Sequence, residues 1–228
     1  GSRHLQAILK LKNNIIIEIV EPDFNAQALA KSRLKDVKYD IKKIELIWHK
    51  SLSLVKNKSD LVIVATNSKG RVDLIEELLK LGHRKFIVEK IVCQSYEEYK
   101  KLLLLMKKFN AKGWINTNRR YFKVYQKIKE KFADSEYIQL SVFAGNSDLG
   151  TNAIHYLDLF CWLVQDYKIK LNGEFLVNQI FENKRGKNFK KFLGTIMGFN
   201  KNSFISLTFF PSKKESFRIK ICGNRYSA

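Results

Sequence analysis

The chain has 228 residues, of which 45% are hydrophobic, so it is long enough to bury a core as one large domain or two small ones. It has no run of about 18 apolar residues and no signal-peptide pattern, so we expect no membrane span and a cytoplasmic location. The cysteines Cys93, Cys161 and Cys222 are far apart and form no C-x-x-C pair, which argues against disulfides and against a zinc knuckle, and we predict no metal site. The net charge of +20 is spread over faces that also carry glutamate, which makes nucleic-acid binding the least favoured function.

The first half of the chain predicts alternating helices and strands. Two apolar runs, 15–20 and 61–65, are continuous and rich in β-branched residues, which is typical of parallel strands covered on both faces. Ser95 and Glu98 form a capping box that begins a long amphipathic helix. The full set predicted here is helices 2–10, 26–34, 72–79 and 96–110 and strands 15–20, 44–48, 61–65 and 86–88. This alternation indicates an α/β fold of the Rossmann type.

The second half changes in character, and we place the boundary near residues 113–120, with domains over 1–115 and 116–228. Polar turns, such as those at 172–173, 185–186 and 200–202, separate five apolar segments, and one helix is predicted over 152–164. The predicted strands are 137–144, 175–181, 192–199, 203–210 and 216–222. We therefore expect an α+β domain with an open, mainly antiparallel sheet.

An acidic residue follows the first strand. In a dinucleotide-binding fold, an acid at the tip of the second strand accepts hydrogen bonds from the adenosine ribose, and its charge repels a 2′-phosphate. Glu21 stands at such a tip and would favour NAD over NADP. The alternative is an ordinary solvated glutamate in a β–α turn.

A glycine-rich turn should precede this acid by about 20 residues, and Gly1 stands there, at the place of the third glycine. The helix that begins at Ser2 would then face the pyrophosphate with its N-terminus. The alternative is a Gly-Ser remnant of a cleaved tag. If the central strand and the other glycines lie upstream, we expect the intact protein to bind NAD and this chain alone to bind it poorly.

Five short motifs occur in register along residues 1 to about 165. They are Gly1-Ser2-Arg3-His4-Leu5-Gln6-Ala7, Glu21-Pro22-Asp23, Asp60-Leu61-Val62-Ile63-Val64-Ala65-Thr66-Asn67, Val88-Glu89-Lys90 and His155-Tyr156-Leu157-Asp158. In this order the chain resembles the glucose-fructose oxidoreductase, inositol dehydrogenase and rhizopine-catabolism family (Gfo/Idh/MocA). The resemblance implies that Gly1, Ser2, Arg3, His4, Glu21, Ala65, Thr66, Asn67 and Glu89 bind the dinucleotide.

The resemblance also implies that Lys90 contacts the reacting hydroxyl. Family members carry Glu-Lys-Pro after the fifth strand, and here the triplet is Glu89-Lys90-Ile91. The lost proline is a residue that fixes the local turn. Without the resemblance, a Glu-Lys pair at a strand end is an ordinary feature of a basic protein.

A histidine on the helix of the second half fits the family's general base. His155 occupies that position, but Thr151, beside Asn152, stands where the family often has an aspartate four residues earlier. Asp148 lies nearby in the sequence but in a turn, and Asp158 could hold the imidazole ring from the other side. A structural histidine is the alternative. Asn118, Arg119 and Arg120 follow the strand that leads into the second domain and would reach substrate or cofactor, or would form a surface turn.

These residues together predict hydride transfer between NAD and a secondary hydroxyl of a sugar, cyclitol or nucleotide-linked sugar, with Lys90 and His155 as the catalytic residues. The alternatives are a catalytically silent NAD-binding member that acts as a sensor or assembly partner, motivated by Thr151 and Ile91, and a nucleic-acid-binding protein. We expect a homodimer or homotetramer formed through the C-terminal sheet, with Phe204, Leu207, Phe209 and Phe210 on the covered surface.

Overall fold

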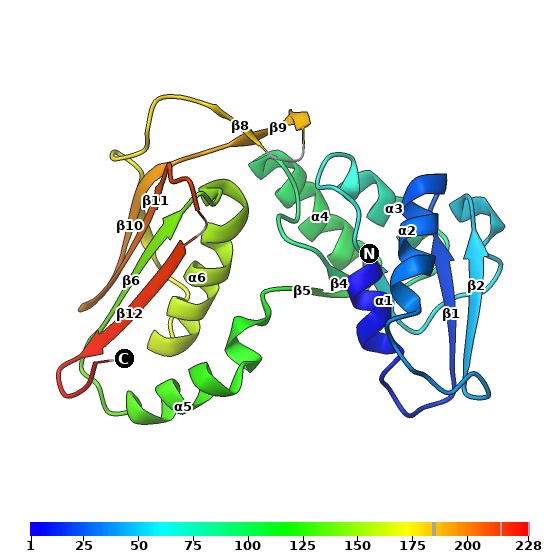
Figure 1. Ribbon diagram of the computed structural model, residues 1–228, viewed down its shortest axis with the longest axis horizontal. Helices are drawn as coiled ribbons and strands as arrows, with labels where there is room; N and C mark the ends of the chain where they lie inside the picture. The colour runs from blue at the N-terminus through cyan, green and yellow to red at the C-terminus, as the bar shows by residue number, and fades with distance from the viewer. Residues whose placement is uncertain (184–185, 215, 228) are drawn as a thin grey trace. The chain divides into compact units, whose positions relative to one another are not determined.

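The computed structural model describes residues 1–183, 186–214 and 216–227 and divides the chain into two compact units, Gly1–Ile115 and Asn116–Ala228. Figure 1 follows the elements of each unit along the chain. The dinucleotide-binding and substrate-binding roles expected for the two halves stay predictions.

Unit 1 alternates helices and strands, as the sequence predicts. Its elements are α1 (Ser2–Ile8), β1 (Ile15–Val20), α2 (Phe24–Leu34), β2 (Ile44–His49), a 3-10 turn η1 (Leu52–Leu54), β3 (Val62–Val64), α3 (Arg71–Lys80), β4 (Lys85–Val88), α4 (Tyr96–Lys108) and β5 (Lys112–Ile115). Every strand pair in this unit is parallel, in a β1-β2 sheet and a β3-β4-β5 sheet. The parallel α/β character inferred from the continuous apolar runs is confirmed.

The core of unit 1 lies between the β3-β4-β5 sheet and the helices α3 and α4. Ile75 and Leu79 of α3 and Phe86 of β4 are fully buried there. Full burial of a side chain of this size stabilises a fold by about 1.5–3 kcal/mol. Ser95 Oγ accepts the Glu98 N–H at 3.1 Å, as a capping box requires, but the Glu98 carboxylate accepts the Gln94 N–H and not that of Ser95. The start of α4 is thus held by both side chains of the predicted box.

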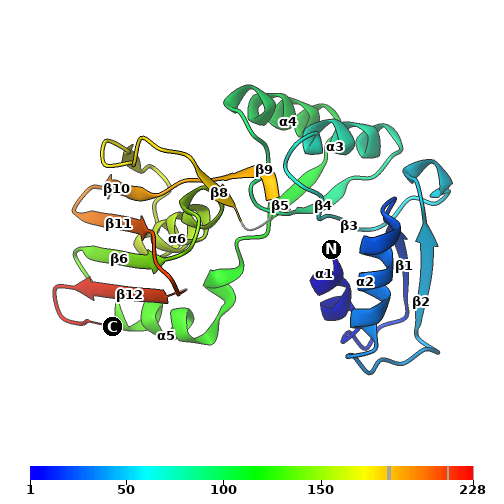
Figure 2. The same cartoon turned by 45° about the horizontal axis from the view of Figure 1, so that its top comes forward.

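Unit 2 is an α+β unit. Its elements are a 3-10 turn η2 (Asn118–Tyr121), α5 (Lys123–Lys131), β6 (Ile138–Gly145), α6 (Leu149–Val164), β7 (Lys170–Asn172), β8 (Phe181–Asn183), β9 (Gly186–Lys191), β10 (Gly194–Asn200), β11 (Ser203–Phe210) and β12 (Ser216–Gly223). The main sheet has the order β12-β6-β11-β10-β7, and Figure 2 shows β12, β6, β11 and β10 side by side. Only β6 and β11 pair in parallel within this sheet, and the other pairs are antiparallel. The predicted mainly antiparallel sheet is confirmed.

Helix α6 covers one face of the main sheet (Figure 1). Alternation along β11 sends Ile205, Leu207 and Phe209 to this face, where each is at most 1% exposed, and sends Phe204 to the other. The prediction that Leu207 and Phe209 belong to a surface covered by a second copy is therefore wrong, because both already fill the core beneath α6.

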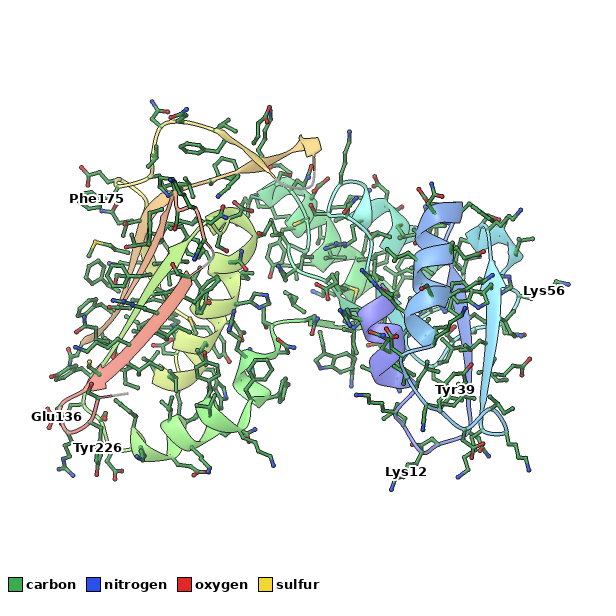
Figure 3. All side chains as sticks on the ribbon, in the orientation of Figure 1. Lys12, Tyr39, Lys56, Glu136, Phe175 and Tyr226 are labelled. Atoms are coloured by element: carbon green, nitrogen blue, oxygen red, sulfur yellow. The ribbon has the colours of Figure 1, made fainter. Side chains whose placement is uncertain are left out.

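Unit 2 differs from the sequence prediction in one absent strand and in several elements that were not predicted, the strands β7 and β9 among them. The strand expected over 175–181 is absent, because Leu176 makes a single bridge with Gly194 and regular pairing begins only at Phe181. Figure 3 shows Phe175 of this loop at the margin of the unit. Helix α5 was not predicted. The polar turn expected at 185–186 falls partly outside the described residues.

Within the described ranges, none of the helices has both the length and the apolar character that a bilayer span requires.

Candidate functional site

The predicted cofactor residues of unit 1 follow the carboxyl ends of parallel strands. Glu21 comes directly after β1, Thr66 and Asn67 come after β3, and Glu89 and Lys90 come directly after β4. Loops at this edge of an open parallel sheet are where α/β folds bind their ligands. The strand ends therefore supply the candidate site.

Helix α1 reaches the loop after β4 through a side-chain contact between His4 and Glu89. His4 Nε2 lies 2.6 Å from Glu89 Oε1, and both side chains are about three-quarters buried, at 23% exposure. The backbone of Glu89 also donates its N–H to Val64 O of β3 at 3.0 Å. Two residues predicted from motifs 85 positions apart thus lie in direct contact.

Three other predicted residues, Ser2, Arg3 and Glu21, also make hydrogen bonds within unit 1. Ser2 Oγ accepts a hydrogen bond from Arg33 of α2 at 2.7 Å, and Arg3 donates to Gln6 at 3.0 Å. Glu21 Oε1 accepts the Asp23 N–H at 3.1 Å, which orients its carboxylate in the turn after β1. These contacts order the segment that the sequence assigns to the dinucleotide.

The sequence did not single out Arg71, the first residue of α3. Arg71 is 2% exposed, and its guanidinium donates to the carbonyl oxygens of Thr66, Glu89 and Ile91. Burial lowers the pKa of Arg71 below its ordinary value, while the nearby Glu89 carboxylate opposes this shift. A signal was present, because Arg71 lies four residues before Ile75, on the buried face of α3.

In unit 2 the two predicted arginines bind side chains of α6. Arg119 donates to Tyr156 Oη at 3.1 Å, and its guanidinium carbon lies 4.3 Å from the centroid of the Tyr156 ring. Burial raises the pKa of Tyr156. Arg120 donates to both carboxylate oxygens of Asp158, and although its burial acts the other way, this pairing raises the pKa of Arg120. The arginines fasten η2 to α6, and Asn118 lies exposed at the start of that turn.

The amino end of α6 is capped by Asp148, which the sequence had placed in a turn. Its carboxylate accepts the N–H groups of Gly150 at 3.1 Å and Thr151 at 3.2 Å. Asn152 donates to Asp148 O at 2.8 Å. Thr151 and His155 are four residues apart on this helix, and both are partly buried.

The suggestion that Asp158 orients His155 meets a competitor, because Arg120 occupies both oxygens of that carboxylate. Lys90 belongs to unit 1 and His155 to unit 2. Within the part of the chain that the structure describes, no cluster of three or more histidine, cysteine or acidic side chains could hold a metal ion.

No protein-family model and no curated protein matches the sequence. Solved structures do match. A dehydrogenase (MviM) from Clostridium difficile has 17% identity and a TM-score of 0.66, over 94% of this chain and 76% of that one. A proposed myo-inositol dehydrogenase from Sinorhizobium meliloti 1021 has 13% identity and a TM-score of 0.73, over 100% of this chain and 71% of that one. The chain has the fold of these dehydrogenases.

A third match with this dehydrogenase fold is the WlbA dehydrogenase from Bordetella pertussis, in complex with NADH and UDP-GlcNAcA. It has 16% identity and a TM-score of 0.67, over 92% of this chain and 69% of that one. At such identities the likeness concerns the fold, and it agrees with the resemblance found in the five sequence motifs.

Proposed function

We propose that the protein is an NAD-dependent oxidoreductase that acts on a secondary hydroxyl of a sugar, cyclitol or nucleotide-linked sugar. The contact of His4 with Glu89 carries this proposal, because it joins α1 to the loop that bears Lys90 in a chain with the dehydrogenase fold. Solved structures with this fold include complexes with NAD⁺ and L-tartaric acid and with NADH and UDP-GlcNAcA. The UDP-GlcNAcA of the second complex is a nucleotide-linked sugar, which is one of the three substrate classes proposed here.

The residues at the strand ends fit a dinucleotide. Gly1 has no Cβ atom and would let the backbone approach a phosphate of the dinucleotide. Glu21 would accept hydrogen bonds from the ribose, which favours NAD over NADP. Thr66, Asn67 and Glu89 would line the rest of the site. The nicotinamide ring supplies the chemistry of hydride exchange when it is bound.

The chain's own residues would handle the proton and the oxygen. Lys90 Nζ would donate a hydrogen bond to the reacting oxygen and stabilise the negative charge that develops on it. His155 would accept the hydroxyl proton as the C–H bond gives up its hydride and the carbonyl forms, and would return that proton in the reverse direction. The remaining predicted residues would contact the substrate or support the residues that contact it. They are Asn118, Arg119, Arg120, Thr151 and Asn152.

The test uses the protein expressed from its complete coding sequence. We expect it to reduce NAD with at least one member of a panel of sugars, cyclitols and nucleotide sugars, measured by the absorbance of the reduced cofactor. Lys90→Met should lower kcat by about 100-fold or more while changing the Kd for NAD by less than about twofold. Lys85→Met, at the exposed amino end of the same strand, is the matched control and should behave as the wild type. Tight NAD binding without turnover on any panel member would contradict the enzymatic proposal.

We also propose that a second copy of the chain covers the open face of the main sheet in unit 2. Phe143 and Phe199 are about half exposed on this face, and Phe199 stacks on Phe204 at a centroid distance of 6.3 Å. Phe143→Glu should convert the dimer or tetramer to a monomer at micromolar concentration, as measured by light scattering. Leu104→Glu, an exposed position on α4, should leave the mass unchanged. A monomeric wild type would refute the proposal.

A further inference from the structure

Arg71 is a positively charged residue on the buried face of α3. Its neighbours along the buried face of the helix, Val72 and Ile75, are apolar and at most 2% exposed. Removing a guanidinium from water is costly unless its donors find acceptors. Any account of this residue must therefore explain which groups its donors hold.

The acceptors are backbone carbonyls of two loops. Arg71 Nη2 donates to Thr66 O, in the loop after β3, and Nη1 donates to Glu89 O and Ile91 O, in the loop after β4. Among the described residues, Arg71 Nε has no hydrogen-bond partner, so the outer nitrogens make all of the contacts. Because the guanidinium is planar and rigid, it fixes the two loops relative to one another and to α3.

Two of these carbonyls flank one residue. Glu89 O and Ile91 O belong to the residues immediately before and after Lys90, so the backbone that carries Lys90 is fastened on both sides. Ile91 occupies the place at which the sequence resemblance has a proline. A proline fixes a turn through its ring, whereas here hydrogen bonds from a distant side chain hold the same segment.

We propose that Arg71 is the positioning residue for Lys90 and sets the geometry of both loops that form the cofactor site. This proposal deepens the function proposed above and rests on it only for the consequence in catalysis. The clamp itself is a property of unit 1 and can be measured without cofactor or substrate. Arg71 acts through the backbone and need not touch the substrate.

The first experiment is hydrogen exchange followed by mass spectrometry on the whole chain. Arg71→Met keeps an unbranched side chain as long as the stem of arginine and removes the guanidinium donors. Amides in peptides covering 64–69 and 88–93 should exchange about tenfold faster or more, because charge-assisted hydrogen bonds to both segments are lost. A peptide covering 138–145, in β6 of unit 2, should be unchanged.

The matched control is Arg84→Met. Arg84 also donates to two carbonyl oxygens, those of Leu79 at 2.7 Å and His83 at 2.8 Å, but neither lies in the loops after β3 and β4. This variant should leave exchange over 88–93 as in the wild type. If Arg71→Met changes neither loop, or speeds exchange uniformly through unit 1, Arg71 is not a local clamp and the proposal falls.

Arg71→Lys keeps the experiment decisive if the Met variant does not fold. A lysine retains the charge but lacks the planar fork, so exchange over 88–93 should still rise, by about threefold or more. A Lys variant with wild-type exchange overturns the proposal. The second readout is rescue by a proline. Ile91→Pro added to Arg71→Met should restore at least half of the protection from exchange that is lost over 88–93. No recovery would show that Arg71 does not hold the loop after β4.

In the protein expressed from its complete coding sequence, Arg71→Met should lower kcat by about tenfold or more with little change in the Kd for NAD. Ile91→Pro should recover part of that loss. Normal loop exchange in an inactive wild type would leave the clamp intact and refute only the oxidoreductase function, so the two proposals fail separately.

Discussion

Asp148 joins the start of α6 to the segment that precedes β10, and its replacement by alanine should weaken unit 2 severely. The carboxylate is 7% exposed and accepts N–H groups from Gly150, Thr151 and Phe192, the last at 2.9 Å. Leu149 N–H donates in return to Phe192 O at 3.0 Å, so this is a two-way connection between distant segments. Asp148→Ala removes a helix cap, at a cost of about 1 kcal/mol, and leaves the Phe192 N–H without its charged acceptor, at a further ~1.5–3 kcal/mol.

The sum is about 2.5–4 kcal/mol, which corresponds to a fall in Tm of roughly 5–15 °C for a chain of this size. Urea and thermal unfolding followed by circular dichroism measure it. Asp148→Asn keeps a good capping side chain without the charge and should lose about half as much. Asp134→Ala, at an exposed aspartate after α5, is the control and should stay within about 0.5 kcal/mol of the wild type. A loss below about 1 kcal/mol for Asp148→Ala would show that these hydrogen bonds do not hold α6 in place.

Three further substitutions test other contacts. Gly194 has φ of +114°, and a Cβ atom there would lie 2.6 Å from Phe175 O, so Gly194→Ala should cost at least about 2 kcal/mol in urea unfolding. Arg120→Met leaves the Asp158 carboxylate buried without its cation and should lower the free energy of unfolding by about 1–3 kcal/mol. The double variant Arg120→Met/Asp158→Leu should recover most of this loss. Additive losses from the two substitutions would show that the pair is not coupled. Burial lowers the pKa of His83, so the unfolded chain binds the proton more readily than the folded chain. The stability that His83 contributes above pH ~6.5 should therefore be lost as the pH falls, by up to about 1.4 kcal/mol per pH unit. Urea unfolding between pH 7.5 and 5 should show this slope reduced in His83→Gln, and an unchanged slope would assign it to other groups.

The elements that the sequence predicted well are those in which one local pattern decides the structure. A continuous β-branched run such as 15–20 needs cover on both faces, and β1 indeed lies in a parallel pair over the same residues. Strand β11 alternates strictly and was predicted at its observed bounds, Ser203–Phe210. In β11, burial of one face accounts for the alternation. Strand β1 pairs with β2 although none of its residues is buried and Ile16 is 67% exposed, so the expected cover on both faces is absent there.

The failures depend on partners that a local pattern does not reveal. The segment from Phe175 has the composition of a strand, but a strand needs a neighbour in register, and Gly194 offers it only one bridge. Helix α5 was missed although Tyr125, Ile128 and Phe132 recur at helical spacing and pack against the core of unit 2. Its lysines obscured that pattern.

The candidate site shows the same division. Glu89 and Lys90 were predicted as site residues because a strand end fixes their place, and His4 because it belongs to a motif in register with them. Arg71 depends on carbonyl groups 5, 18 and 20 residues away in the sequence, and any residue type presents a carbonyl, so no side-chain pattern in the loops identifies this contact.

The hydrogen bonds to backbone carbonyls explain how the loop after β4 tolerates Ile91. His4 binds the side chain of Glu89, while Arg71 binds the carbonyl oxygens on both sides of Lys90. Groups outside the segment therefore constrain it, and the side chain at position 91 need not fix the turn. Ile91, in place of the proline of the family that the sequence resembles, is consequently weak evidence against the proposed role of Lys90, whereas replacing Arg71 would remove the constraint itself.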